Sequence, residues 1–539
     1  MQQTQRPAAK RERAERREQA AATRATRAAE AAVASRSFPW TRIALALAVI
    51  VEVATWTGRA AAEDAAPVDA PPIAAQSAQD PSPPTPEAAP DLELKTAIGE
   101  ASQQALIANR KVEILEEQLA AKSKEAAVVS ADDKGFGLRS ADASNSLRIR
   151  GLLQADSRWF AYDGALSDRS DTFLIRRFRP TLDGTLLGLA DFRLTPDFAG
   201  GAVVVFDAYA DIHPVPWLRL RAGKFKPPLG LERLQSDPDV PLTERALTQY
   251  LTPTREVGAS LWGDLAGGVF SYSIGLFNGS PDNGNLDVDS NHAKDFSFRV
   301  LLQPFKVEDL KDLGSLGVHF AVSTGNRFGT PTNPQLPSFR TAGQNTFFSY
   351  LAPGAGTTAD PTGSGTPFAH LRQTRLNPGL YYYYEGFGFL GEVVESSQQV
   401  QKGNTTATLI HRAAHATFSI VFGGRNGYDG PTPTTAFNRA RDTWGAWELA
   451  GRWSYLRVSD AAFGNPNDPT APVFADPLKS AKRAQAWAIA VNLIPSRTIK
   501  LGATFERTSF AGGAAAADKK TVSDRKVENA VFGRVQLNF

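Results

Sequence analysis

The chain has no cysteine among its 539 residues, which excludes disulfide bonds, thiolate nucleophiles and cysteine-ligated metals. It has a single methionine, Met1, so translation from a later start would need a codon other than that for methionine. It also lacks the repeated apolar runs of roughly 20 residues that transmembrane helices need, and its mean hydropathy is -0.26. A helical membrane protein is therefore excluded. A membrane barrel is not, because its lipid-facing side chains alternate with polar ones.

The chain has no large excess of charge of either sign. The formal net charge is +3, too small for the basic field of a nucleic-acid-binding protein, so we expect no nucleic-acid partner. Any preference for anions must come from local groups. The chain instead has 44 glycines and 35 prolines, many of them in turn-like clusters, as an architecture of short strands requires. We expect no cofactor and no metal, with metal binding by His411 and His415, four residues apart, as the alternative.

The N-terminal residues have the pattern of a secretion signal. Residues 10–42 are rich in arginine, glutamate and alanine, residues 43–53 are nearly all apolar, and residues 60–62 are three alanines at a cleavage-like spacing. We predict a signal peptide with an extended n-region over residues 1–62, cleaved after Ala62. A retained membrane anchor is the alternative, although the apolar run is too short to span a bilayer comfortably.

Two segments separate this signal from the rest of the chain. Residues 63–90 are rich in proline and alanine and have no periodicity, which indicates an extended linker. Residues 91–130 form a predicted helix with a heptad pattern. Apolar residues recur every seven residues at two positions of the heptad. The first position is occupied by Ile98, Ala105, Val112 and Leu119, and the second by Leu94, Ala101, Ala108 and Leu115. We expect a short coiled coil formed by self-association, with a lone amphipathic helix packed on the same chain as the alternative.

From residue 146 the period of the apolar residues changes to two, as in strands with one polar face. The clearest alternating segments are residues 147–159, 203–212, 447–455 and 531–539. Repeated strands of roughly ten residues have the length that a tilted transmembrane strand needs. The predicted fold class is all-β, a transmembrane antiparallel β-barrel over residues 146–539 preceded by the coiled-coil helix. A soluble sandwich or propeller would show the same alternation.

Further features favour the membrane barrel over a soluble sheet. Aromatic residues lie at strand ends, where a barrel has interfacial girdles. They are Trp159, Phe160, Trp217, the four tyrosines 381–384 and Trp444. The last residue, Phe539, ends an amphipathic strand, which resembles the C-terminal signal of bacterial outer-membrane barrels. Long connections at residues 326–372, 423–440 and 460–479 are typical of extracellular loops.

If the apolar faces of these strands meet lipid, several arginines line a pore. Arg177 and Arg179 share one face of a candidate strand. A pore-lining ladder is predicted from Arg148, Arg150, Arg219, Arg221 and Asp207. Asp207 would temper the affinity for anions, since conduction needs sites weak enough to release their ligand. Ordinary pairing of these charges within the wall is the alternative.

Between residues 227 and 250 the alternation stops, because four prolines bar regular sheet. The segment and its flank are rich in cations, namely Lys224, Lys226, Arg233 and Arg245. A charged surface loop is one interpretation. In a barrel with inward arginines we expect instead a loop folded into the lumen as a constriction, where a positive ring would select anions.

Three separated segments resemble one family, the phosphate-selective porins O and P. They are FLIRRFRPTLDGTL at residues 173–186, AYADIHPVPWLRLRAGKFKPPLGLERL at 208–234 and GAWELAGRWSYL at 445–456. The resemblance covers residues 146–539. It implies a barrel of about sixteen strands in the outer membrane of a Gram-negative cell. It further implies a homotrimer that contacts outer-membrane lipid, passes inorganic phosphate or related anions, and is inserted by the barrel-assembly machinery through Phe539. The coiled coil would then lie on the periplasmic side.

The resemblance also suggests an anion site. The family's RR motif matches Arg176 and Arg177, its basic residue after GLE matches Arg233, and the arginine of its ER pair matches Arg245. With Arg179 and Lys226 nearby, the predicted constriction comprises Arg176, Arg177, Arg179, Lys226, Arg233 and Arg245. Pleating puts Arg177 and Arg179 on one face, so Arg176 joins them only if the strand bulges or the sheet has ended.

The best-known members have lysine at the position of Arg233, and a planar guanidinium binds phosphate oxygens bidentately where an ammonium acts as a point charge. A more cationic constriction suits larger anions such as polyphosphate, so the choice between phosphate and polyphosphate stays open.

Other functions remain open at this stage. A less selective general porin, or one for another solute, would have the same barrel. A barrel that mainly tethers the envelope would use the linker and the coiled coil. An outer-membrane hydrolase is a third possibility, since His411 and His415 lie on one face of a strand, but no serine motif or nearby acidic partner accompanies them. We therefore expect a channel and no enzyme.

Overall fold

The computed structural model describes residues 90–125, 127–161, 171–287, 289, 292–307, 312–352, 365–465 and 468–539. The predicted signal peptide, and the predicted linker except for Pro90, lie outside the described residues. No helix in the described ranges is long and apolar enough to span a bilayer.

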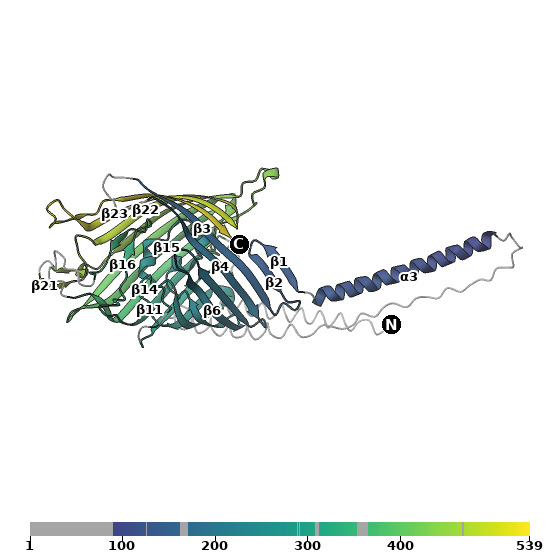
Figure 1. The fold of residues 1–539 in the computed structure, drawn as a ribbon, viewed down its shortest axis with the longest axis horizontal. Helices are drawn as coiled ribbons and strands as arrows, with labels where there is room; N and C mark the ends of the chain where they lie inside the picture. Colours follow the sequence, from purple (N-terminus) through teal and green to yellow (C-terminus); the bar gives the residue numbers. More distant parts are fainter. Residues whose placement is uncertain are drawn as a thin grey trace, which may run out of the picture. The chain divides into compact units, whose positions relative to one another are not determined.

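Sixteen antiparallel strands of the described chain close into a barrel, in which the last strand, β25, pairs with the first, β3 (Figure 1). The barrel strands are β3 (Ser146–Phe160), β4 (Thr172–Leu186), β5 (Ala190–Asp197), β6 (Val204–Val215), β7 (Leu218–Phe225), β8 (Glu256–Leu265), β9 (Phe270–Phe277), β10 (Asp295–Leu302), β11 (Gly317–Phe328), β14 (Phe368–Tyr384), β15 (Phe387–Lys402), β16 (Thr405–Phe422), β19 (Ala446–Arg457), β22 (Ala481–Ser496), β23 (Ile499–Ala515) and β25 (Glu528–Asn538). The predicted transmembrane barrel is confirmed.

The remaining elements are short, apart from one helix. The minor strands are β1 (Val128–Asp132), β2 (Gly135–Arg139), β12 (Phe339–Arg340), β13 (Thr346–Phe348), β17 (Gly424–Arg425), β18 (Thr432–Pro433), β20 (Phe463–Asn465), β21 (Asp468–Val473) and β24 (Val522–Asp524). The helices are α3 (Pro90–Glu125) and α4 (Leu231–Leu234), and the 3-10 helices are η1 (Asp237–Asp239), η2 (Leu247–Leu251), η3 (Ala266–Gly268), η4 (Arg439–Arg441) and η5 (Asp460–Ala462).

The strands form a barrel because their polar and apolar side chains alternate. In β16, for example, His411, His415 and Ser419 are buried inside the barrel, whereas Phe418 and Ile420 are exposed on its outer face. A membrane barrel has this pattern because lipid solvates the outer face and the lumen is polar. The apolar outer side chains thus need no second layer of protein.

The two ends of the barrel differ. The chain terminus, the turn at residues 187–189 and the turn at residues 385–386 lie at one end, which we call the turn end. Most long connections, including residues 329–367 and 458–480, lie at the other, the loop end. One expectation is wrong. Residues 423–445 connect β16 to β19 at the turn end, because the β15–β16 hairpin has already closed at the loop end with a two-residue turn.

An apolar core lies inside the barrel near its loop end. Phe339, Phe347 and Phe348 from one long connection and Phe474 from another are almost fully buried against the inner wall formed by β15, β16, β19, β22 and β23. These connections therefore fill part of the bore. The polar cavities described below lie mainly along β3 to β8.

The predicted aromatic girdle is only partly correct. Trp159, Trp217 and Trp444 are exposed, as an interfacial residue should be. Tyr381 and Tyr383, in contrast, point inward and are buried, and Tyr381 packs against Tyr428 with ring centroids 4.9 Å apart. A run of four tyrosines in a strand must place alternate rings on opposite faces, so half of it cannot belong to the girdle.

The segment before the barrel contains a helix and a hairpin. The helix α3 ends at Glu125, earlier than the expected boundary at residue 130, because Val128 already begins β1. β1 and β2 form an antiparallel hairpin, and β2 pairs with the first residues of β3. Large apolar side chains of α3, such as Ile98, Val112 and Leu115, are exposed. Self-association of this helix stays a prediction.

A glycine in β7 permits close approach of two backbones. Gly223 has φ +126°, and a Cβ there would lie 2.2 Å from the carbonyl oxygen of Ala208. We expect Gly223→Ala to lower the free energy of unfolding by about 3 kcal/mol, since the substitution combines backbone strain with a clash against backbone atoms.

The matched control is Gly188→Ala, because Gly188 also has a positive φ, +62°, but no atom lies within 4 Å of its would-be Cβ. Gly188→Ala should lower the free energy of unfolding by about 1 kcal/mol. Urea unfolding in detergent micelles measures both values, and equal losses would contradict the backbone contact at Gly223.

Candidate functional site

The connection between β7 and β8, residues 226–255, is folded into the barrel, and we call it the inner loop. It forms hydrogen bonds to side chains of the opposite wall: Gly230 N donates to Asn377 Oδ1 (2.8 Å), and Leu231 N to Glu392 Oε2 (2.6 Å). Further along, Leu247 N donates to Ser454 Oγ (2.9 Å). The prolines of the loop prevent strand pairing, so these backbone N–H groups donate hydrogen bonds to side chains of the wall instead.

A β-bulge in β4 brings two consecutive arginines to the inside. Gln154 pairs with Arg177 and Ala155 with Ile175, so Arg176 is the extra residue of the bulge. Arg176 reaches Glu244 of the inner loop, with Nε 2.5 Å from Oε1, and Arg177 donates to Gln154 Oε1 (2.6 Å). Of the two routes by which Arg176 was expected to join Arg177, the bulge is the one present.

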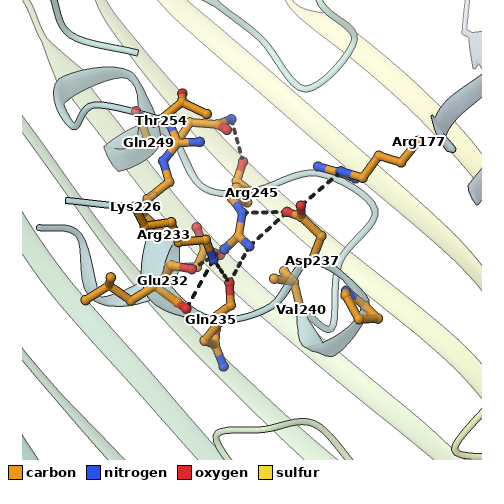
Figure 2. Close-up of polar contacts among 12 residues, drawn as sticks. Arg177, Lys226, Glu232, Arg233, Gln235, Asp237, Val240, Arg245, Gln249 and Thr254 are labelled. Carbon is orange, nitrogen blue, oxygen red and sulfur yellow. Dashed lines mark hydrogen bonds and ion pairs between the residues drawn. The ribbon is translucent and has the colours of Figure 1, made fainter. Parts of the chain in front are cut away.

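Asp237 of the inner loop is the common partner of three arginines. Arg245 Nη2 lies 2.9 Å from Asp237 Oδ1, and Arg177 Nε lies 3.4 Å from Oδ2 (Figure 2). Arg179 also donates to Oδ2, and its Nε bonds Asp197 at 2.6 Å. Burial alone would raise the pKa of the Asp237 carboxyl, but these arginines hold it well below its usual value. Asp237 therefore carries a full negative charge that links the loop to β4.

Glu244 is a second link between the loop and the wall. It accepts hydrogen bonds from Arg176 and from Arg158 (3.1 Å). Its carboxylate is buried, which would raise its pKa, but Arg176 outweighs burial and lowers the pKa to about 2. Two carboxylates of one loop thus hold five arginines of the wall and the loop in place.

A cavity of about 290 Å³ adjoins the inner loop, and we call it the constriction cavity. All six residues predicted for the constriction line it, namely Arg176, Arg177, Arg179, Lys226, Arg233 and Arg245. Arg255 and Arg340 line it too. Among the described residues of the lining, Asp237 is the only carboxylate. Eight cationic side chains and one acid therefore face a single space.

Sequence reasoning missed Arg255 and Arg340 for different reasons. Arg255 is the last residue of the inner loop and lies five residues beyond the end predicted at residue 250. Arg340 comes from the connection between β11 and β14, where nothing in the sequence marks it. It reaches the cavity because its neighbour Phe339 is fully buried and stacks on Phe348, with ring centroids 5.2 Å apart.

Arg233 and Lys226 have no carboxylate partner among the described residues. Arg233 donates to the carbonyl oxygen of Gln249 (2.6 Å) and to Asn283 Oδ1 (3.0 Å), while Lys226 donates to the carbonyl of Gln235 (2.5 Å). Burial, and then the charge of Arg245, lower the pKa of the Arg233 guanidinium to about 9. Burial and Arg255 lower the pKa of Lys226 as well. Burial is the larger cause of both shifts, and repulsion from neighbouring arginines adds to it.

The constriction cavity continues into two others towards the turn end. A middle cavity of about 330 Å³ shares Arg179, Lys226 and Arg255 with it. A turn-end cavity of about 610 Å³ shares Arg150 and Arg221 with the middle one. Every predicted ladder residue lines one or both of the last two: Arg148 and Arg219 the turn-end cavity, Asp207 the middle cavity, Arg150 and Arg221 both.

Most of the ladder is internally paired, which was the alternative left open by the sequence. Arg150 bonds Asp183, Arg219 lies 3.3 Å from Asp191, and Arg221 lies 2.6 Å from Asp211. Asp207 pairs with Arg255 at 2.7 Å. The ladder arginines are only half-buried, so one face of each guanidinium group still lines the cavity.

Two histidines considered for catalysis are held by neighbouring side chains. His411 Nε2 lies 2.9 Å from the Tyr350 hydroxyl, and its Nδ1 accepts a hydrogen bond from the Ser459 N–H. His415 Nδ1 lies 3.1 Å from Thr248 Oγ1 and 3.7 Å from Glu392. The expectation that no acid lies nearby is wrong, because Glu392 is directly opposite His415 on β15. Within the described ranges, no three His, Asp or Glu side chains are grouped to hold a metal ion.

A closed sixteen-stranded barrel with an inward loop defines a transmembrane channel of the porin class. Residues 147–539 match the family model described as phosphate-selective porin O and P, and the chain belongs to that family of outer-membrane porins. The family is one of channels rather than enzymes. A search of curated proteins found no match.

Solved structures of other porins are similar in fold. The outer membrane channel DcaP of Acinetobacter baumannii has 11% identity and a TM-score of 0.46, over 75% of this chain and 99% of that one. An anion-selective porin from Comamonas acidovorans has 10% identity and a TM-score of 0.45, over 73% and 100%. OmpT of Vibrio cholerae has 10% identity and a TM-score of 0.43, over 74% and 100%. Likenesses this distant say nothing about what this chain conducts.

Two acids of the inner loop should respond to pH in opposite ways. The pKa of Glu244 is lowered from 4.5 to about 2, so its contribution to stability is complete above pH 4.5 and is lost as the pH falls towards 2. Glu244→Gln should therefore lower the free energy of unfolding by about 3 kcal/mol at neutral pH, and the difference from wild type should vanish near pH 2.

Asp239 is the matched control, because burial raises its pKa from 3.8 to about 7. The folded state binds its proton more tightly than the unfolded state, so Asp239 costs stability as the pH rises from 3.8 to 7. Asp239→Asn should be more stable than wild type above about pH 7 and equal to it near pH 4. Urea unfolding across this pH range measures both variants. A loss of stability in both at neutral pH would contradict the assignment.

Proposed function

We propose that this chain forms a passive outer-membrane pore for anions, with phosphate or polyphosphate as its ligand. One observation carries the proposal: eight cationic side chains and a single carboxylate line the constriction cavity. A positive ring in a low-dielectric wall attracts anions and repels cations. Chloride would feel the same field, but a guanidinium fork binds two oxygens of a tetrahedral oxyanion such as phosphate, which chloride does not offer.

The site residues take different parts in this proposal. Arg233, Lys226 and Arg340 bind the anion, because they have no carboxylate partner among the described residues. Arg176, Arg177, Arg179 and Arg245 contribute charge while also holding the loop through Glu244 and Asp237. The half-buried arginines of the ladder then offer weaker sites along the path to the turn end. Movement down a concentration gradient needs no energy input.

Asp237 and Asp207 keep the site from holding its anion too tightly. Each places a negative charge beside arginines that line a cavity. A site that bound phosphate with every cation unopposed would release it slowly, and conduction requires release.

The rest of the assembly follows from the family. We propose a homotrimer in contact with outer-membrane lipid, inserted by the barrel-assembly machinery through Phe539. The turn end and the coiled coil of residues 91–130 would face the periplasm, and the loop end the exterior. A general porin, or a barrel used mainly as an envelope tether, would lack an anion preference. Single-channel recording decides between them.

The deciding experiment is single-channel recording in planar bilayers with potassium chloride gradients and added phosphate. Anion-selective reversal potentials, with chloride current blocked by millimolar or lower phosphate, are the expected result. Cation preference would overturn the proposal, and an anion preference without block would leave a general anion pore in place of a phosphate site.

Arg233→Gln should weaken phosphate block about tenfold, because it removes an unpaired charge-assisted donor from the cavity. The barrel should stay folded, since Arg233 forms no ion pair with a described acid. Arg507→Gln is the matched control, because Arg507 lies on the outer face of β23, where it bonds Asn529 at 3.0 Å. Equal block in wild type and Arg233→Gln would move the binding site elsewhere.

Asp237→Asn should have the opposite effect on affinity. Removing the carboxylate frees Arg177, Arg179 and Arg245 from a shared partner, so phosphate should block chloride current at concentrations about tenfold lower. Phosphate dwell times in single-channel records should lengthen accordingly. Weaker block would indicate that Asp237 serves chiefly to position the loop. In that case the unfolding midpoint of the same variant should also be lower than that of wild type.

A further inference from the structure

The outer face of the barrel carries three arginines side by side on consecutive strands. Arg412 of β16 pairs directly with Arg457 of β19, and Arg457 pairs with Arg483 of β22. All three are exposed, while their chain neighbours His411, Leu456 and Ala484 are buried inside. We call Arg412, Arg457 and Arg483 the outer arginine row. It points away from the lumen and takes no part in the pore.

An aromatic band lies next to the row on the side of the turn end. It consists of Tyr455, Trp453 and Trp487, and Trp453 pairs directly with Trp487. Beyond it the outer face is apolar, with Leu449, Ile489 and Val491 exposed. Aromatic side chains of membrane barrels mark the boundary between hydrocarbon and headgroups. The row therefore lies at the level of the headgroups of the leaflet nearer the loop end.

Three like charges in register are costly without an anion, because directly opposite side chains in a sheet are only about 5 Å apart. Two of the arginines have acidic partners: Arg412 bonds the half-buried Glu395 and Arg457 bonds the exposed Asp460, each at 2.6 Å. Exposed pairs of this kind contribute little. Arg483 forms no ion pair with a described residue. The row thus retains positive charge that its surroundings leave partly unopposed.

We propose that the outer arginine row binds the phosphate groups of a glycolipid in the outer leaflet of the membrane. Guanidinium groups bind phosphate oxygens bidentately, and the exposed forks are directed to where such headgroups lie. Two gaps between strands give the row a span of roughly 10 Å, enough for two phosphate groups. The apolar and aromatic surface below it accommodates the acyl chains. This site does not involve the proposed anion pore, but its place in the outer leaflet rests on the proposed orientation of the loop end towards the exterior.

The test uses the full chain in detergent micelles, with diphosphorylated lipid A and its enzymatically dephosphorylated form as probes in native mass spectrometry. Wild type should bind the phosphorylated form at least about tenfold more tightly, as loss of charge-assisted bonds implies. The variant Arg412→Gln/Arg457→Gln/Arg483→Gln should lose this preference. The triple lysine variant should keep part of it, because a point charge replaces each fork.

The matched control removes three exposed arginines at the turn end, as Arg439→Gln/Arg441→Gln/Arg497→Gln. It should keep the preference of wild type. Heat-modifiable migration on gels shows whether each variant is folded. Equal binding of both lipid forms by wild type, or equal loss in the control, would overturn the proposal. Binding of inorganic phosphate at the row without preference for the phosphorylated lipid would overturn the lipid as its ligand.

Discussion

The carboxylate of Asp237 is the contact on which the cationic site depends. It lies between Arg177 and Arg179 of the wall and Arg245 of the inner loop. Three buried guanidinium groups so close together repel one another, and one carboxylate at their centre offsets much of that repulsion. Together with the bond between Glu244 and Arg176, it holds the inner loop against β4. With it the cluster keeps an excess of positive charge, which is what an anion site requires.

Most of the fold could be predicted from the sequence because alternation of polar and apolar residues depends only on the strand itself. Predictions from the alternation were wrong where the position of a residue or connection depends on neighbouring strands. The connection at residues 423–445 looked like an extracellular loop, yet the tight β15–β16 hairpin puts it at the turn end. Tyr381 and Tyr383 looked interfacial, yet the pleat turns both rings towards the lumen.

The candidate site shows the same division. The residues around Arg176 and within the inner loop were found because their charges interrupt a pattern or resemble a family motif. Arg340 was not, since its position depends on a distant connection anchored by the burial of Phe339 among other aromatic rings. The partners of the ion pairs could not be predicted either. The sequence placed Asp207 on the polar face of its strand, but only the three-dimensional structure shows that it pairs with Arg255.

The arginines of this barrel act differently because their surroundings differ. Inside, guanidinium groups are buried and mostly paired, so the few without a carboxylate partner dominate the local field. Outside, the side chains of Arg412, Arg457 and Arg483 are exposed, and the ion pairs of Arg412 and Arg457 offset only part of the repulsion between neighbours. Under our two proposals a phosphate group suits both settings, as a mobile solute within the lumen and as part of a lipid at the surface. Burial, rather than residue type, would then decide which of the two an arginine binds.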